Sequence, residues 1–224
     1  KTLKPHPGVE FEHRDMDYQI PDVVVTKKNH HWSVQLNPDV LPKLKINPYY
    51  SNMIRRSDQS VENQYLKNQM FEAKNFIKSV EERHKTLLKV ATCIVAHQRA
   101  FFEIGAEGMK PLVLREVAEE VDLHESTVSR VTTNKYMLTP RGLFELKYFF
   151  SSSVNTTSGG EASSTAIRAK IKKLVAEENP RKPLSDNAIA VLLKEDGIDV
   201  ARRTVAKYRE SLHIPASSDR KVLI

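Results

Sequence analysis

The sequence contains little cysteine and glycine and no long apolar stretch, and each shortage excludes a class of protein. Its single cysteine, Cys93, excludes an internal disulfide framework and a metal site built from several cysteines. Seven glycines in 224 residues, with neither G-x-x-x-x-G-K nor G-x-G-x-x-G, argue against a phosphate-binding loop. No apolar run approaches the roughly 20 residues that span a bilayer, and no apolar leader is seen, so we expect a cytoplasmic protein without membrane contact.

Charge is abundant and unbalanced. The chain has 35 Lys and Arg against 28 Asp and Glu, a net charge of +7, and 40% hydrophobic residues, enough to form a core. Residues 165–224 hold 13 Lys or Arg and 8 Asp or Glu, so +5 of that charge lies in the last quarter of the chain. Positive charge concentrated in this way predicts a polyanionic partner, and nucleic acid before any other.

Proline separates the first part of the chain from the rest. Residues 1–60 contain six of the eleven prolines, a density that excludes long helices. Within them, residues 23–26 and 31–36 flank a polar tetrapeptide and predict a β-hairpin. Residues 49–104 contain neither proline nor glycine, which permits a long helix there.

A single long helix is predicted over residues 66–104. Apolar or small residues recur across it at spacings of three and four, a period of 3.5, at Leu66, Met70, Ala73, Ile77, Val80, Leu87, Ala91, Ile94 and Phe101. Such a helix would be a rod roughly 60 Å long. Because His84 and Gln98 interrupt the seam, we expect packing against other parts of the protein and not a dimeric coiled coil.

Residues 113–132 fit a helix-turn-helix inside a compact helical unit, 106–150. Small Ala118 lets the two helices cross closely, Asp122 occupies the turn, and Val128 anchors the second helix. That helix then exposes short hydroxyl side chains and an arginine, which suits entry into a DNA groove, where a bidentate arginine contact with guanine contributes about 1–3 kcal/mol of discrimination. The alternative is a helical hairpin with a polar surface.

A second, slightly stretched helix-turn-helix is predicted near the C-terminus. Ser185 caps its first helix and Gly197 follows that helix, while its second helix covers about residues 201–212. Arg202 and Arg203 lie at the start of this second helix, the end that enters a major groove. The alternative is a basic face that adds only non-specific affinity for phosphate.

The expected fold is therefore mainly α-helical, in five segments. They are a small β-containing part (1–62), the long connecting helix (63–105), the helix-turn-helix unit (106–150), a flexible Ser/Gly linker (151–164) and a three-helix DNA-binding domain (165–224).

We expect no catalytic site, no metal and no cofactor. His30 and His31 are adjacent on a strand, so their side chains diverge, and His84 and His97 are thirteen residues apart and expected to be structural. Cys93 is most simply a small buried hydrophobe. A recombinase or nuclease would need a tyrosine nucleophile, for which the candidates are Tyr136, Tyr148 and Tyr208. The last of these lies on an apolar helix face, where tyrosine is typical of a core.

Two stretches resemble the bacterial sigma-54 family of transcription initiation factors. Residues 201–210, Ala-Arg-Arg-Thr-Val-Ala-Lys-Tyr-Arg-Glu, match the RpoN box of that family at every position, and residues 111–130 resemble its helix-turn-helix. The resemblance implies two partners, core RNA polymerase and double-stranded promoter DNA with -24 and -12 elements. Residues 1–62 resemble the C-terminal part of the core-binding domain. Full-length members also respond to an activator ATPase, through a segment that we do not find in this chain.

The same resemblance implies two sets of DNA-binding residues. For the -24 element the RpoN box supplies Arg202, Arg203, Thr204, Lys207, Tyr208 and Arg209. For the -12 element the helix-turn-helix supplies His124, Ser126, Thr127, Ser129, Arg130 and Thr133. The alternative function is a DNA-binding regulator with two sites that does not bind polymerase.

Overall fold

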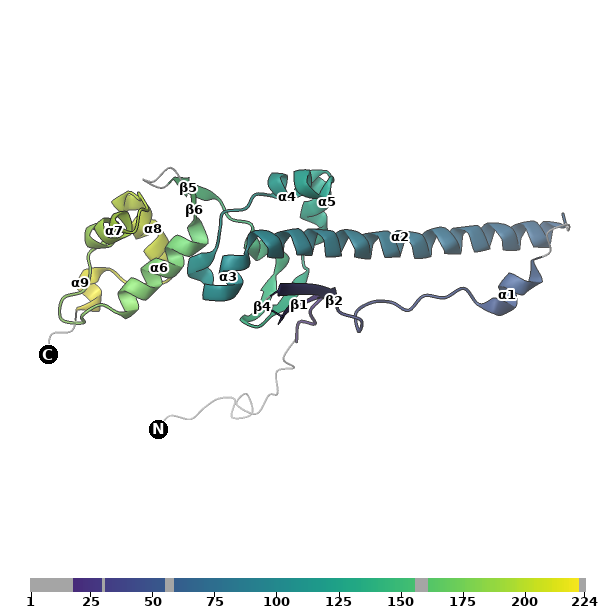
Figure 1. Cartoon of the computed structure of the whole chain (residues 1–224), viewed down its shortest axis with the longest axis horizontal. Helices are drawn as coiled ribbons and strands as arrows, with labels where there is room; N and C mark the ends of the chain where they lie inside the picture. Colours follow the sequence, from purple (N-terminus) through teal and green to yellow (C-terminus); the bar gives the residue numbers. More distant parts are fainter. Residues whose placement is uncertain (1–17, 30, 55–58, 156–160, 222–224) are drawn as a thin grey trace, which may run out of the picture.

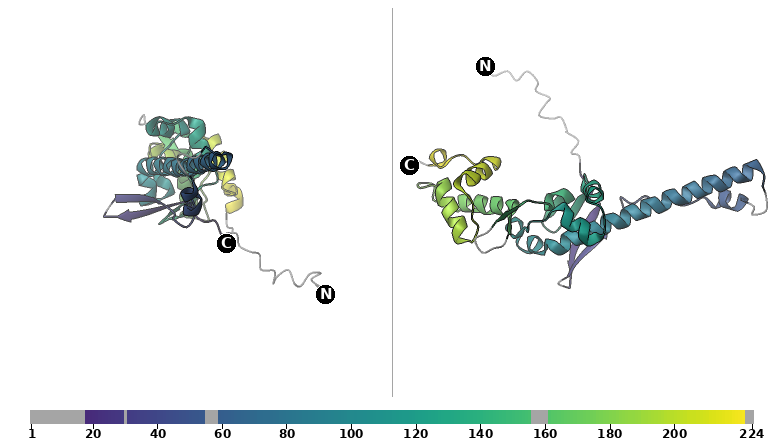
Figure 2. Two further views of the ribbon diagram at one scale, coloured as in Figure 1. Left: turned by 90° about the vertical axis from the view of Figure 1, so that its right-hand side faces the viewer. Right: turned by 90° about the horizontal axis from the view of Figure 1, so that it is seen from above.

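The computed structural model describes residues 18–29, 31–54, 59–155 and 161–221 and is mainly α-helical, which confirms the expected fold class (Figure 1). A central body contains a sheet and short helices. One long helix projects from it as a rod, and a C-terminal helical domain lies on the opposite side of the body (Figure 2). None of the described helices is both long and apolar enough to cross a membrane.

The rod is helix α2, Val61–His97, about 56 Å long at 1.5 Å per residue. Ser60 caps its N-terminus, where the hydroxyl accepts a hydrogen bond from Asn63 N, and the outer half of the helix carries exposed aromatic rings. The inner half buries one face from Leu87 onward, where Val90, Ala91 and Ile94 are inaccessible to solvent. The prediction of one continuous helix to residue 104 is wrong, because the helix is interrupted at Gln98 and continues as a separate helix, α3 (Arg99–Ile104).

Gln98 is one of the two polar residues in the helical seam, and its contacts explain why a polar side chain is buried there. Its side chain is fully buried, its Nε2 donates to Lys110 O (2.8 Å) and Phe149 O (3.2 Å), and its Oε1 accepts from Lys110 N (2.9 Å). One amide therefore pairs with three backbone groups from two separate segments, which fixes both segments against the base of the rod.

Two hairpins form one four-stranded sheet in the order β2-β1-β3-β4. The strands are β1 (Val23–Lys28), β2 (His31–Leu36), β3 (Tyr136–Thr139) and β4 (Gly142–Glu145). The predicted N-terminal hairpin is confirmed, but the unit 106–150 is not purely helical, because β3 and β4 follow the helix-turn-helix. β1 pairs in parallel with β3, and Lys135 Nζ is 2.7 Å from Asp22 Oδ1 beside that junction.

One apolar core joins the inner rod, the sheet and the helix-turn-helix. It includes Ile94 of α2, Phe101 of α3, Val128 of the helix-turn-helix and Met137 of β3, all essentially inaccessible to solvent. Aromatic rings cluster at its end, with Phe101 and Phe149 in edge contact at a centroid distance of 5.2 Å. The inner rod, the sheet and the helix-turn-helix therefore share a single core.

The C-terminal domain has its own core and four helices in the described residues. They are α6 (Ser164–Ala176), α7 (Asp186–Glu195), α8 (Arg202–Ser211) and α9 (Ser217–Arg220). The linker predicted to be flexible differs from the structure at its flanks, because β5 (Ser153–Asn155) pairs with β6 (Glu161–Ser163); residues 156–160 lie outside the described residues. Ser163 caps α6. Helix α6 packs against the short 3₁₀ helix η2 (Ala106–Gly108).

We predict that Gln98→Ala lowers the free energy of unfolding by about 3 kcal/mol, because it leaves three buried backbone groups unpaired. Urea unfolding followed by the fluorescence of Trp32, which packs in the same core, measures this change. The control is Gln69→Ala on the exposed part of α2, which should change the value by less than about 0.5 kcal/mol. Equal effects of the two substitutions would contradict the role given to Gln98.

Candidate nucleic-acid interface

The sequence predicts two units that read DNA, and each is called a reader below. The first reader is the helix-turn-helix formed by α4 (Leu114–Val121) and α5 (Glu125–Thr132). Asp122 ends α4 in the left-handed conformation (φ 55°, ψ 53°), as its position in the turn requires. Leu123 N then donates to Ala118 O at 2.9 Å. Ala118 and Val128 are buried as predicted, so the helix crossing is confirmed.

The residues around the start of α5 are used partly for capping the helix. His124 Nδ1 accepts from Ser126 N (3.2 Å) and lies 2.8 Å from Ser126 Oγ. Thr133 Oγ1, at the far end, donates to Ser129 O at 2.8 Å. His124, Ser126 and Thr133 are nevertheless exposed, whereas Thr127 and Ser129 are half-buried. The backbone and hydroxyl groups of α5 are thus held in place before any ligand arrives.

Arg130 extends from α5 into solvent and has no hydrogen-bond or ion-pair partner among the described residues. It lines a recess of about 290 Å³ together with Arg83 of α2 and with Lys135, which is already paired with Asp22. Arg83 is exposed and adds a second positive charge beside the reading helix. Sequence reasoning missed Arg83, because nothing local shows that the rod passes next to α5.

The second predicted reader is formed by α7 and α8. Gly197 adopts φ 83° in the turn between them, and Ile198 N donates to Leu193 O at 2.8 Å. Ile189 and Leu193 of α7 pack with Val205 of α8, and all three are fully buried. The start of α8 is therefore fixed by a turn that needs a left-handed residue and by an apolar contact one turn later.

The exposed face of α8 carries three free cations. Arg202, Arg203 and Lys207 are exposed and have no hydrogen-bond or ion-pair partner in the described part of the chain. The two arginines line a shallow recess of about 540 Å³ at the N-terminus of the helix. Because the amide groups at a helix N-terminus also favour anions, this end of α8 is suited to a phosphate or to the edge of a base.

Arg209 does not belong to this exposed face, and its predicted place in the DNA-binding set needs correction. Its side chain is buried, with Nε 2.8 Å from Asp186 Oδ1 and Nη1 donating to Ile214 O at 2.7 Å. The hydrogen bond with Asp186 raises the pKa of Arg209. Arg209 therefore connects α8 to α7 and to the chain after α8, and it cannot reach a duplex without breaking these bonds.

Tyr208 also faces inward. It is half-buried against the C-terminal core, and the guanidinium of Arg168 lies 5.8 Å from the centre of its ring. Thr204 is half-buried as well. Helix α8 consequently has an inner side that packs in the domain and an outer side that carries the exposed cations.

A second ion pair between an arginine and a carboxylate holds the C-terminal end of the domain. Arg220 Nε donates to Glu178 Oε1 at 2.7 Å, and both side chains are more than nine-tenths buried. The hydrogen bond from Arg220 holds the pKa of Glu178 below its ordinary value. This pair attaches α9 to the loop before α7, and it was not predicted because the two residues are 42 positions apart.

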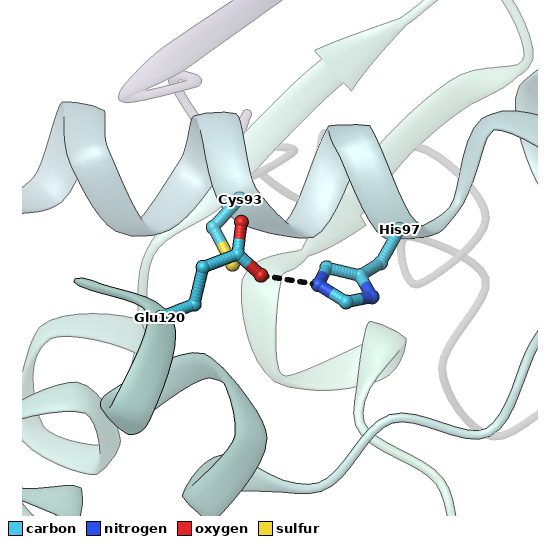
Figure 3. A group of neighbouring side chains, drawn as sticks. All are labelled: Cys93, His97 and Glu120. Carbon is cyan, nitrogen blue, oxygen red and sulfur yellow. Dashed lines mark hydrogen bonds and ion pairs between the residues drawn. The ribbon is translucent and has the colours of Figure 1, made fainter.

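One cluster of potential metal ligands occurs in the described residues, at the contact between α2 and α4. It consists of Cys93 and His97 on α2 and Glu120 on α4 (Figure 3). The sequence analysis treated the cysteine and the histidine separately and expected no metal. Their spacing of four residues on one helix was the signal that could have joined them, but nothing in the sequence placed Glu120 opposite.

Two family models match the chain. One is described as the sigma-54 DNA-binding domain and covers residues 63–222, and the other is described as the core-binding domain of the sigma-54 factor and covers residues 1–50. The first alone spans more than half of the chain, and it contains both of the predicted readers.

Curated relatives and a solved structure agree with this match. The chain is 84% identical to the RNA polymerase sigma-54 factor of Acinetobacter guillouiae, 60% to that of Azotobacter vinelandii and 56% to that of Escherichia coli K12, each over 224 residues. All of this chain but only 45–47% of each relative is covered, so the chain spans less than half of their length. The crystal structure of Aquifex aeolicus sigmaN bound to promoter DNA aligns with a TM-score of 0.61 at 33% identity, over 99% of this chain and 69% of that one.

We predict that Arg209→Ala destabilises the C-terminal domain by about 3 kcal/mol, because Asp186 loses the partner of a largely buried ion pair. The matched control is Arg202→Ala on the same helix, which should change stability by less than about 0.5 kcal/mol. Hydrogen exchange of the α7 and α8 amides measures the stability of this domain alone. A small effect of Arg209→Ala would show that the arginine is dispensable for folding.

Proposed function

Because this chain belongs to the sigma-54 family, we propose that it is the promoter-recognising part of a transcription initiation factor that binds core RNA polymerase in the cytoplasm. The proposal rests on the charge and exposure of the outer side of α8. There Arg202, Arg203 and Lys207 of the RpoN box are exposed and unpaired among the described residues, while the other side of the helix is packed.

We infer that α8 reads the -24 element and that α5 lies at the -12 element. Arg203 and Lys207 are one helical turn apart on the outer side of α8, so both can approach the same groove. At α5 the free cation is Arg130, and the neighbouring Arg83 of the rod adds attraction for the phosphate backbone without reading bases. The Aquifex aeolicus structure, which is bound to promoter DNA, supports this arrangement through its shared fold.

Core polymerase is the second proposed partner, and residues 1–50 support it because they match the core-binding model. The core-binding match ends at residue 50 and the DNA-binding match begins at residue 63, so the second match includes most of the rod. Members of the family are transcription factors, and we propose that this chain likewise catalyses no reaction. Response to an activator ATPase would be a property of the longer protein.

We predict that Arg203→Ala weakens binding to a duplex that carries a -24 GG element by about tenfold to a hundredfold, because a bidentate arginine contact with guanine is lost. Affinity for a duplex of scrambled sequence should fall much less. Fluorescence anisotropy with both duplexes at one salt concentration measures the ratio. Arg181→Ala, an exposed arginine of the same domain outside α8, is the control.

Two outcomes would contradict the assignment of α8. Unchanged affinity of Arg203→Ala for the GG duplex would mean that the helix does not contact the element. An equal loss on both duplexes would mean that α8 binds phosphate without reading sequence.

We predict that the whole chain co-elutes with purified core RNA polymerase in the absence of DNA, because the core-binding match lies outside both DNA readers. Size-exclusion chromatography measures the complex, and the double variant Arg203→Ala/Arg130→Ala should still form it. A chain that binds the two-element duplex but never polymerase would favour the alternative, a regulator with two DNA sites.

A further inference from the structure

The cluster of Cys93, His97 and Glu120 lies where the rod meets the helix-turn-helix. Cys93 and His97 are one turn apart on α2 and project toward α4, from which Glu120 points back at them (Figure 3). The three donor atoms, a thiol sulfur, an imidazole nitrogen and a carboxylate oxygen, all lie within 4.8 Å of one another. His97 Nε2 is 2.5 Å from Glu120 Oε2.

We propose that Cys93, His97 and Glu120 bind a single Zn²⁺ ion, with the fourth coordination position open to solvent. Thiolate, imidazole and carboxylate are the protein ligands that Zn²⁺ uses, at about 2.0–2.3 Å from the ion. Ligands on a tetrahedron of that size are about 3.5 Å apart, which is between the 2.5 Å that separates His97 from Glu120 and the 4.8 Å within which all three donor atoms lie.

The surroundings of the cluster provide access for the ion. Cys93 is buried, whereas the side chains of His97 and Glu120 are 39% and 51% exposed, so the site is closed on the thiol side and open on the other. A recess of about 440 Å³ between α2 and α4 is lined by Cys93 and Glu120 and opens to solvent. A water molecule can therefore complete the coordination, as in zinc sites with three protein ligands.

The neighbouring groups set limits on the affinity. Burial, followed by the hydrogen bond with Glu120, raises the pKa of Cys93 to about 12, so the ion must displace a proton from the thiol. Lys89 also lines the recess, and its positive charge opposes that of the ion.

Binding would couple the rod to the reader. Two ligands come from α2 and one from α4, so a bound ion would cross-link the rod to the first helix of the helix-turn-helix and thereby fix α5. The alternative reading is a solvent-exposed ion pair beside a buried thiol, and an exposed pair of this kind contributes less than about 1 kcal/mol. The two readings differ in their response to metal.

Titration of the metal-free chain with Co²⁺, followed by displacement with Zn²⁺, tests the proposal. A thiolate ligand gives Co²⁺ an intense charge-transfer absorption, and we expect that band to saturate at one equivalent and to disappear on adding Zn²⁺. Excess Zn²⁺ should raise the melting temperature by about 5 °C when it is present at about a hundred times its Kd.

The variants have matched controls on the same two helices. Glu120→Gln and His97→Gln should each weaken Co²⁺ binding at least tenfold, whereas Glu119→Gln and His84→Gln should leave it unchanged. All four side chains are at least partly exposed, so these variants should fold, which circular dichroism checks. Cys93→Ala should abolish the charge-transfer band.

Three outcomes would overturn the proposal. They are the absence of a charge-transfer band in the unsubstituted chain, an unchanged affinity in both Glu120→Gln and His97→Gln, and an equal loss in the control variants. None of these measurements involves DNA or polymerase, so a failure here is distinct from a failure of the proposed function.

Discussion

The structure depends on one constraint, the burial of the inner half of the rod. Ile94 is inaccessible to solvent because the sheet lies on one side of α2 and the helix-turn-helix on the other, and Gln98 pairs with backbone from two further segments in the same core. Apolar burial alone would let these elements slide, whereas a buried amide with three partners has one register. The position of α5 relative to the rod follows from that register.

In the C-terminal reader, one side of helix α8 packs in the domain and the other side is exposed. Positions 205, 208 and 209 fall on one side of α8 and are occupied by Val, Tyr and an arginine that Asp186 neutralises. Positions 203 and 207 fall on the other side and carry free cations. Composition cannot distinguish Arg209 from Arg203. Their positions around the helix differ, and so do their surroundings, because Arg209 is buried and paired with Asp186 whereas Arg203 is exposed.

Residue preferences within a few positions predicted most of the helices and the first hairpin. They did not predict the contacts between residues that are far apart in the sequence. The left-handed turn at Asp122 and the first hairpin follow from residue preferences within a few positions, and the structure has both. The parallel pairing of Val23 with Met137 joins strands more than a hundred residues apart, so no local pattern announces it. The same reason hid Arg83 beside Arg130. For the candidate site, the helices and their exposed cations were predictable, but the inward turn of Arg209 was not, because its partner lies on another helix.

The contact between the C-terminal domain and the central body is smaller than the apolar core of either reader. Helix α6 meets the body through η2, the small buried residue Ala166 and an ion pair of Lys173 with Glu107 at 3.4 Å. The Lys173 and Glu107 side chains are 54% and 36% exposed, so this pair contributes at most about 1 kcal/mol. Each reader, in contrast, is held by a continuous apolar core. If a duplex engages α5 and α8 together, as proposed, moving the C-terminal domain relative to the body breaks fewer apolar contacts than distorting either helix-turn-helix.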